Sequence, residues 1–255
     1  MNAFVLAEAA AFVLAVARIA GFIIVSPFPG KNVPQKAKIG LILLLAFLAR
    51  ASHPASASLA LDLRLLALVP AELMLGIVIG FTVRVTFSAA EILGASFAQS
   101  IGMTMGAVYD PTLGTEDPIA ARVMTLFAML LFLALGAHRV ALGYVLESFR
   151  AIPIGQTVDL SGSAFTFVGF IDQAMEAGVR LSMPVMAVGL CIQVALALVA
   201  RASPSLQIFS IGMGVTVAAG ILAILGSMED TRAGLAAEIS KTGARIEQVL
   251  TTSPP

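Results

Sequence analysis

The sequence is poor in the residues from which many catalytic, metal and disulfide sites are built. It has one cysteine, two histidines, two tyrosines and no tryptophan. A single Cys191 excludes a disulfide within the chain, and one Cys with His53 and His138 is too few for a metal site of Cys and His. We therefore expect neither metal nor disulfide chemistry.

Recurrent catalytic motifs are also missing. The sequence has no His-Glu-x-x-His helix motif, which excludes a zinc-dependent intramembrane protease of that type. It has no Gly-x-Ser-x-Gly motif for an exposed nucleophile and no glycine-rich phosphate loop of the GxxxxGK[ST] form. We predict that the chain is not an enzyme and uses no cofactor.

Charge is scarce as well. Charged residues make up 12% of the chain and apolar residues 59%, with a mean hydropathy of +0.99. Soluble domains are about 25% charged and roughly 45–50% apolar. The net charge is zero, which gives no sign of a nucleic-acid partner. Glu8 precedes the first apolar stretch, where a signal peptide would be basic, so we expect no cleavable signal. This composition indicates a membrane protein.

The apolar residues gather in long runs. Lipid leaves no partner for free backbone amides, so helices are expected, and a bilayer core of about 30 Å takes roughly 20 helical residues. The prediction is an all-α, membrane-class chain of helical hairpins. The runs cover residues 9–28, 39–49, 65–83, 85–109, 123–146, 181–200 and 205–228.

Some features do not fit lipid-facing spans. Residues 39–49 are too few to cross, and we interpret them as a re-entrant segment or as part of a hairpin packed on protein. Charged residues also lie within or beside the apolar runs. Each would cost about 2.5–3.5 kcal/mol at a lipid-facing helix centre. We therefore expect them to face other helices, a lumen or other subunits. They are Arg18, Glu72, Arg84, Glu91 and Arg180.

The character of the chain changes after Met228. Residues 229–250 have an amphipathic pattern typical of a helix, followed by a Ser-Pro-Pro end. We predict one helical membrane domain over residues 1–228, with residues 229–255 forming an amphipathic C-terminal helix and tail.

Two carboxylates in apolar runs, Glu72 and Glu91, allow two interpretations. They could be the proton-coupling groups of a transporter. Alternatively, each pairs with a basic residue such as Arg84, because a lone buried charge would change its ionisation unless paired. The spacing of Gly76 and Gly80 is typical of close helix contacts and says little about the partner.

Together these residues resemble the FliR family of flagellar biosynthesis proteins and its type III secretion counterparts. The resemblance runs in order through about 200 residues. Its motifs are Arg18-x-x-Gly21-Phe22, Pro27-x-x-Gly30-x-x-Val33-Pro34 with Lys38, Glu72-x-x-x-Gly76-x-x-x-Gly80-Phe81, Gly94, Gly102 to Asp110-Pro111, Phe132 with Gly136-x-His138-Arg139, Ser148-Phe149-x-x-x-Pro153-x-Gly155, Pro184-Val185, and Arg201-x-x-Pro204 with Phe209-x-Ile211-Gly212. Gln207 and Gly214 depart from the family pattern, which usually has Asn and Pro there.

The resemblance implies a core subunit of the flagellar export gate. FliP-type, FliQ-type and FlhB-type subunits would be its partners, and unfolded protein substrates would pass through a closed helical channel in the bacterial inner membrane, at the flagellar basal body. It also implies that some apolar hairpins are raised out of the bilayer inside the complex. Residues expected to serve subunit packing or ion pairs are Arg18, Glu72, Gly76, Gly80, Arg84, Glu91, Arg201 and Pro204.

The same resemblance assigns residues to the channel itself. It implies a methionine constriction near Met103 and Met105, and a plug loop within residues 106–121. The plug residues are Gly106, Tyr109, Asp110, Pro111, Leu113, Gly114, Glu116, Asp117 and Pro118. Two other functions stay open: a proton-coupled secondary transporter, and an assembly scaffold of a secretion complex that contributes nothing to the pore.

Overall fold

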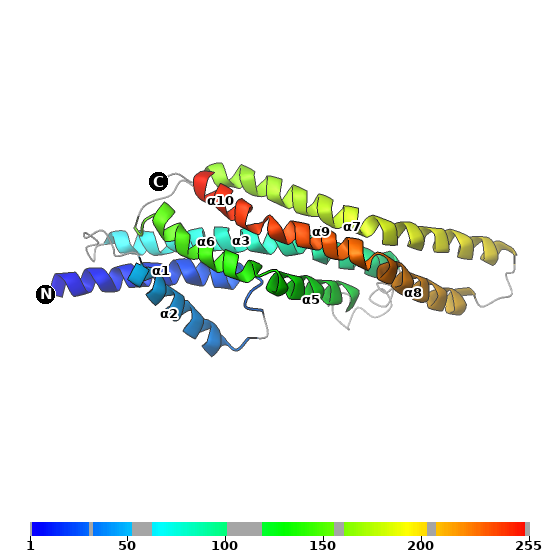
Figure 1. Cartoon of the computed structure of the whole chain (residues 1–255), viewed down its shortest axis with the longest axis horizontal. Helices are drawn as coiled ribbons and strands as arrows, with labels where there is room; N and C mark the ends of the chain where they lie inside the picture. Colours follow the sequence, from blue (N-terminus) through cyan, green and yellow to red (C-terminus); the bar gives the residue numbers. More distant parts are fainter. Residues whose placement is uncertain are drawn as a thin grey trace. The chain divides into compact units, whose positions relative to one another are not determined.

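All regular elements in the described part of the chain are α-helices. The computed structural model describes residues 2–30, 33–52, 63–100, 119–155, 161–202 and 208–252. The exclusively helical regular structure of these residues confirms the all-α prediction. The helices are α1 (Asn2–Val25), α2 (Gln35–Ser52), α3 (Leu63–Ser100), α5 (Ile119–Ala134), α6 (Ala137–Ala151), α7 (Ser161–Ala202), α8 (Ile208–Gly226), α9 (Met228–Ser240) and α10 (Thr242–Thr252), as labelled in Figure 1.

Several helices have the length and composition of membrane spans. Among the described residues, three qualify, over Ala7–Val25, Ala67–Ser100 and Thr166–Val199. The number rises to five if each of two bent helix pairs, α5 with α6 and α8 with α9 and α10, is one span. The membrane-class prediction is thereby confirmed.

Two helices are longest relative to the apolar runs that predicted them. Residues 65–83 and the start of 85–109 form one helix, α3, because Arg84 lies on an exposed face and does not interrupt it. The run at 181–200 is the second half of α7, which has 42 residues and includes Pro184. At 1.5 Å per residue these helices are about 57 and 63 Å long, roughly twice the thickness of a bilayer core.

Elsewhere the structure divides stretches that the sequence pattern predicted as continuous. The stretch 123–146 is divided at Gly136, whose φ of 69° lies in the left-handed region that favours glycine and ends α5 before α6 begins. Residues 229–250 form two helices, α9 and α10, with a break at Lys241. α1 ends at Val25, before Pro27 and Pro29, whereas the apolar run extends to residue 28.

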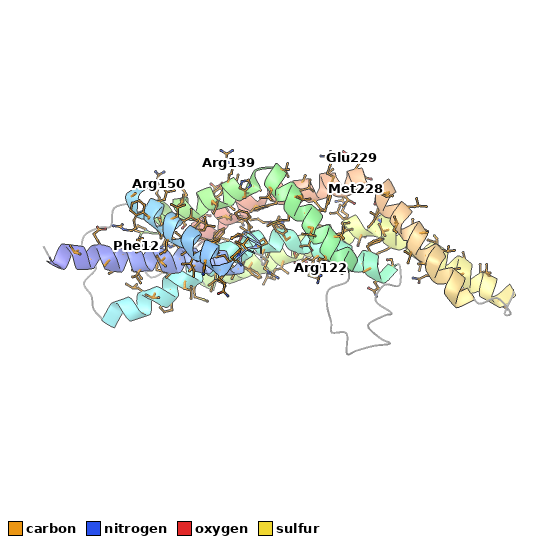
Figure 2. All side chains as sticks on the ribbon, turned by 90° about the horizontal axis from the view of Figure 1, so that it is seen from below. Phe12, Arg122, Arg139, Arg150, Met228 and Glu229 are labelled. Carbon is orange, nitrogen blue, oxygen red and sulfur yellow. The ribbon has the colours of Figure 1, made fainter. Side chains whose placement is uncertain are left out.

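The chain divides into two compact units. The first comprises residues 1–86, 136–171 and 240–255. In it, α2 packs on α1 and α10 packs on α6. Helix α6 is amphipathic: Ala141, Val145 and Phe149 are buried, whereas Arg139 and Arg150 extend away from the ribbon in Figure 2. The proposed boundary at residue 229 stays a prediction.

The second unit comprises residues 87–135 and 172–239. The Phe87 ring of α3 contacts the Phe132 ring of α5, with centroids 5.2 Å apart. Phe97 and Val185 join α3 to α7 in a buried apolar cluster. At Gly178 of α7 an added Cβ would lie 3.0 Å from the Ala89 carbonyl oxygen, so α3 and α7 meet almost backbone to backbone.

Candidate functional site: a buried ion pair and an exposed helix face

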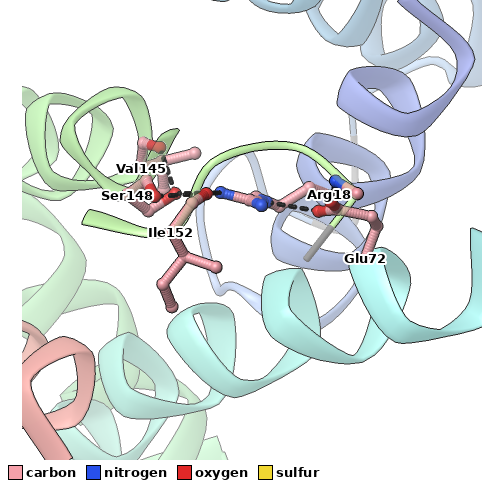
Figure 3. A network of polar contacts seen from close by, with 6 residues as sticks. Arg18, Glu72, Val145, Ser148 and Ile152 are labelled. Atoms are coloured by element: carbon pink, nitrogen blue, oxygen red, sulfur yellow. Dashed lines mark hydrogen bonds and ion pairs between the residues drawn. The ribbon is translucent and has the colours of Figure 1, made fainter. Parts of the chain in front are cut away.

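A buried ion pair joins α1 to α3 in the first unit. Arg18 of α1 donates through Nε to Glu72 Oε2 of α3 at 2.6 Å. The two side chains are 0% and 1% exposed. Charges removed from water this completely are stable only when their remaining polar atoms also find partners. Figure 3 shows that Arg18 finds further partners at Ser148 and Ile152, in α6 and directly after it.

Arg18 binds carbonyl oxygens at the C-terminal end of α6 and just after it. Its Nη1 donates to the Ser148 and Ile152 carbonyl oxygens, both at 3.0 Å, and lies 3.3 Å from Ser148 Oγ. The last carbonyls of a helix have no partner within the helix and carry partial negative charge, so a cation there is favourable. The guanidinium also lies over the Phe149 ring, 4.3 Å from its centroid. Its Nη2 is buried without a partner among the described residues.

Glu72 holds the turn that follows α6. Its Oε1 accepts a hydrogen bond from the Gly155 amide at 3.0 Å, and Gly155 has a φ of 87° that favours glycine. Both carboxylate oxygens are therefore occupied, one by Arg18 and one by the backbone. We call Arg18, Glu72, Ser148, Ile152 and Gly155 the Arg18 cluster.

Glycines bring α1 and α3 close enough for the pair to form. A Cβ added at Gly76 would lie 1.8 Å from the Arg18 carbonyl oxygen, and one at Gly80 would lie 2.6 Å from the Phe22 carbonyl oxygen. On the facing helix, a Cβ at Gly21 would lie 2.2 Å from the Leu73 carbonyl oxygen. Gly76 and Gly80 thus pack this chain's own helices; a role in contacts with other subunits stays a prediction.

The Gly76→Ala substitution is expected to destabilise the α1–α3 pair by about 1–3 kcal/mol, because overpacking forces the two backbones apart. Gly143→Ala in α6 is the matched control, since nothing lies within 4 Å of an added Cβ there. Alanine should stabilise that helix by up to about 1 kcal/mol. Thermal unfolding of the two full-length variants in detergent measures the difference. Equal melting temperatures would contradict the close packing.

The other expected site residues are placed differently. Arg84 and Glu91 are exposed on α3, and within the described ranges neither forms an ion pair. The basic partner expected for Glu72 exists, but it is Arg18 and not Arg84. Arg201 is exposed near the end of α7. Pro204, the constriction residues Met103 and Met105, and the plug residues within 106–118 lie outside the described residues.

Sequence reasoning missed the α6 half of the cluster. In the sequence, the Ser148-to-Gly155 stretch is only a motif of the resemblance. In the structure, Arg18 contacts its serine and the carbonyl before Pro153, and Glu72 accepts from its glycine. A second missed pair joins Glu8 of α1 to Arg50 of α2 and ties the two helices together.

A long exposed face runs along α7 in the second unit. Only 17% of its most apolar stretch is buried in the chain. Among its exposed residues, one apolar set recurs every three or four positions and so forms a continuous row along the helix. The exposed residues include the apolar residues Met175, Val179, Met183, Met186, Leu190, Val194 and Leu198, and the charged residues Asp172, Glu176 and Arg180. We call them the α7 face.

Long apolar helices, glycine-mediated contacts and a buried ion pair define the class: an all-α membrane protein. The model of "Bacterial export proteins, family 1" matches residues 9–241. The chain belongs to this family.

Curated relatives agree with the family assignment. The flagellar biosynthetic protein FliR of Escherichia coli (strain K12) is 29% identical over 192 residues, which cover 75% of this chain and 73% of that protein. The protein of the same name from Bacillus subtilis (strain 168) is 27% identical over 223 residues, 86% of each chain. That of Aquifex aeolicus (strain VF5) is 26% identical over 215 residues, covering 83% and 82%.

Proposed function

We propose that the chain is a core subunit of the flagellar type III protein export gate. It forms part of the closed channel through which unfolded substrates cross the bacterial inner membrane at the flagellar basal body. The observation that carries this proposal is the family match over residues 9–241, together with relatives named as flagellar biosynthetic proteins.

Helix length supports a place in a larger assembly. α3 and α7 are about 57 and 63 Å long and apolar over most of their lengths, whereas a bilayer core of about 30 Å covers only half of such a helix. The remaining apolar surface needs protein to cover it. FliP-type and FliQ-type subunits, with an FlhB-type protein, are the partners we propose.

The α7 face suits such a partner. Asp172, Glu176 and Arg180 are exposed among apolar side chains, and each would cost about 2.5–3.5 kcal/mol against lipid at the centre of a bilayer. A neighbouring gate subunit with opposite charges would compensate them. The three methionines of the face add unbranched side chains that adapt to a partner's shape.

The Glu91→Gln substitution is expected to lower the yield of assembled gate without changing the stability of the chain, because Glu91 is exposed on α3 and open to a partner. Glu147→Gln is the control: its carboxylate is exposed and pairs with Arg150 on the outer side of α6. Co-purification of partner subunits measures the yield. An unchanged yield with the Glu91→Gln variant would show that Glu91 has no role in assembly.

The proton-coupled transporter is the main alternative. The geometry of Glu72 favours an ion pair, because both of its oxygens are engaged and the carboxylate has no access to water. Reconstitution of the chain alone separates the two functions. A transporter moves a small solute without other subunits, and a gate subunit does not.

A trapped substrate tests the pore itself. A photo-crosslinking residue at Tyr109 or Leu113, in the proposed plug, should capture an export substrate stalled in the channel. The control is the same residue at Arg139, which is exposed on α6. If the substrate crosslinks to the partner subunits but to neither plug position, the chain is better described as an assembly scaffold that contributes nothing to the pore.

A further inference from the structure

The side of α2 that faces away from α1 is apolar and uncovered within the described residues. Leu45, Ala46 and Ala49 are buried, on the side that packs toward α1. The opposite side exposes five large side chains. They are Ile39, Leu43, Leu44, Phe47 and Leu48, which are 44–67% exposed. We call these five residues the α2 face.

The composition of the α2 face differs from that of the helix contacts in this chain. α1 and α3 approach through Gly21, Gly76 and Gly80, as membrane helices do when small residues let their backbones meet. The α2 face instead presents large, branched or aromatic side chains without a charge among them. It also lacks the charged residues that mark the α7 face. Such a surface fits lipid chains better than another helix.

Charged residues bracket the α2 face at both ends. Lys36 lies seven and eleven residues before Leu43 and Phe47, about two and three helical turns, so it continues the same side of the helix. Arg50 lies at the other end and is neutralised by Glu8. The span from Lys36 to Arg50 is about 21 Å at 1.5 Å per residue, within the thickness of a bilayer core.

We propose that the α2 face lies against lipid and that Lys36 binds an anionic lipid headgroup. Lysine can bury its alkyl stem along an apolar surface while its ammonium reaches the headgroup region. The basic end is then the end that contacts anionic lipid, because Lys36 is exposed and the Arg50 charge is compensated. The proposal does not depend on the export function.

Nitroxide accessibility tests the face directly. Cys191 is the only cysteine, so the Cys191→Ala chain carrying Leu44→Cys takes one spin label. The labelled chain, purified with its bound subunits, is placed in vesicles of phosphatidylglycerol and phosphatidylethanolamine. We expect frequent collisions with oxygen and few with a water-soluble nickel complex. Few collisions with either would mean that protein covers the face, and frequent collisions with nickel would mean water. Either result overturns the proposal, and Leu48→Cys repeats the test at a second position.

Lys36 and Lys38 provide a matched pair of variants for the headgroup. In phosphatidylglycerol vesicles, Lys36→Glu should raise severalfold the collision rate of the nickel complex with the nitroxide at Leu44→Cys. In phosphatidylcholine vesicles it should have little effect on that rate. Lys38→Glu makes the same charge change at a half-buried position on the side of α2 toward α1, and should leave the label unchanged. Equal responses to the two variants, or no response to Lys36→Glu, would overturn the headgroup contact.

Discussion

Glu72→Gln is expected to destabilise the first unit by about 3–5 kcal/mol, since removing one partner of a buried ion pair leaves the other charge uncompensated. The Arg18 guanidinium would stay buried without a negative charge beside it. A glutamine side chain has one acceptor oxygen, so it can accept from Arg18 Nε or from the Gly155 amide but not from both, and its NH2 group faces the other donor. The full-length variant should unfold at a lower temperature and be cut sooner by protease.

Two further variants separate charge from packing. Arg18→Met combined with Glu72→Met removes both charges and should recover part of the loss, because an apolar pair of similar volume can replace a buried ion pair. Recovery should be incomplete, since the Ile152 carbonyl loses its Arg18 donor and the Ser148 carbonyl keeps only the Ile152 amide. Glu147→Gln, which breaks an exposed pair, should unfold like the parent chain. A Glu72→Gln chain as stable as its parent would contradict the cluster's structural role.

Deletion of residues 108–118 is expected to make the assembled gate leak ions. The segment lies outside the described residues, and the prediction rests on its sequence and on the family resemblance. Gly114 gives permissive backbone, and Pro111 and Pro118 prevent the flanking helices from continuing through it. Tyr109 and Leu113 offer apolar contacts for a seal.

The leak is measured as loss of membrane potential, or as entry of small permeants into cells that express the deletion. Co-purification with the partner subunits must be unchanged, so that a failed assembly is not mistaken for an open channel. Replacing residues 156–160, another connecting segment, by a glycine-serine linker of equal length is the control. If the gate that lacks residues 108–118 assembles and stays ion-tight, this loop is not the plug.

The fold class could be predicted from composition, but helix boundaries could not. A scarcity of charge and apolar runs of about 20 residues favour membrane helices, and the regular elements of the described residues are all helices. The pattern divided α3 at Arg84 because a charge looks like a boundary, yet the helix continues when that side chain lies on an exposed face. It joined α5 to α6 because Gly136 looks apolar, although its left-handed conformation ends the helix.

The buried site was half visible in the sequence. Arg18 and Glu72 stood out because charges are costly in apolar helices, and the need for a partner followed from the same physics. The identity of that partner did not, because the two residues are 54 positions apart and meet only through the packing of α1 on α3. The Ser148 and Ile152 carbonyl oxygens could not be found from residue types, since every residue has one.

The mass of the native complex tests the central claim most directly. The chain, affinity-purified from membranes with its bound subunits, should give one defined complex that contains FliP-type and FliQ-type proteins. Expressed alone, the chain should be degraded. The α7 face, and the apolar surface of α3 and α7 that extends beyond a bilayer core, would then have no partner subunit to cover them. A stable, monodisperse monomer in detergent, with no co-purifying subunit, would contradict the assignment to the export gate.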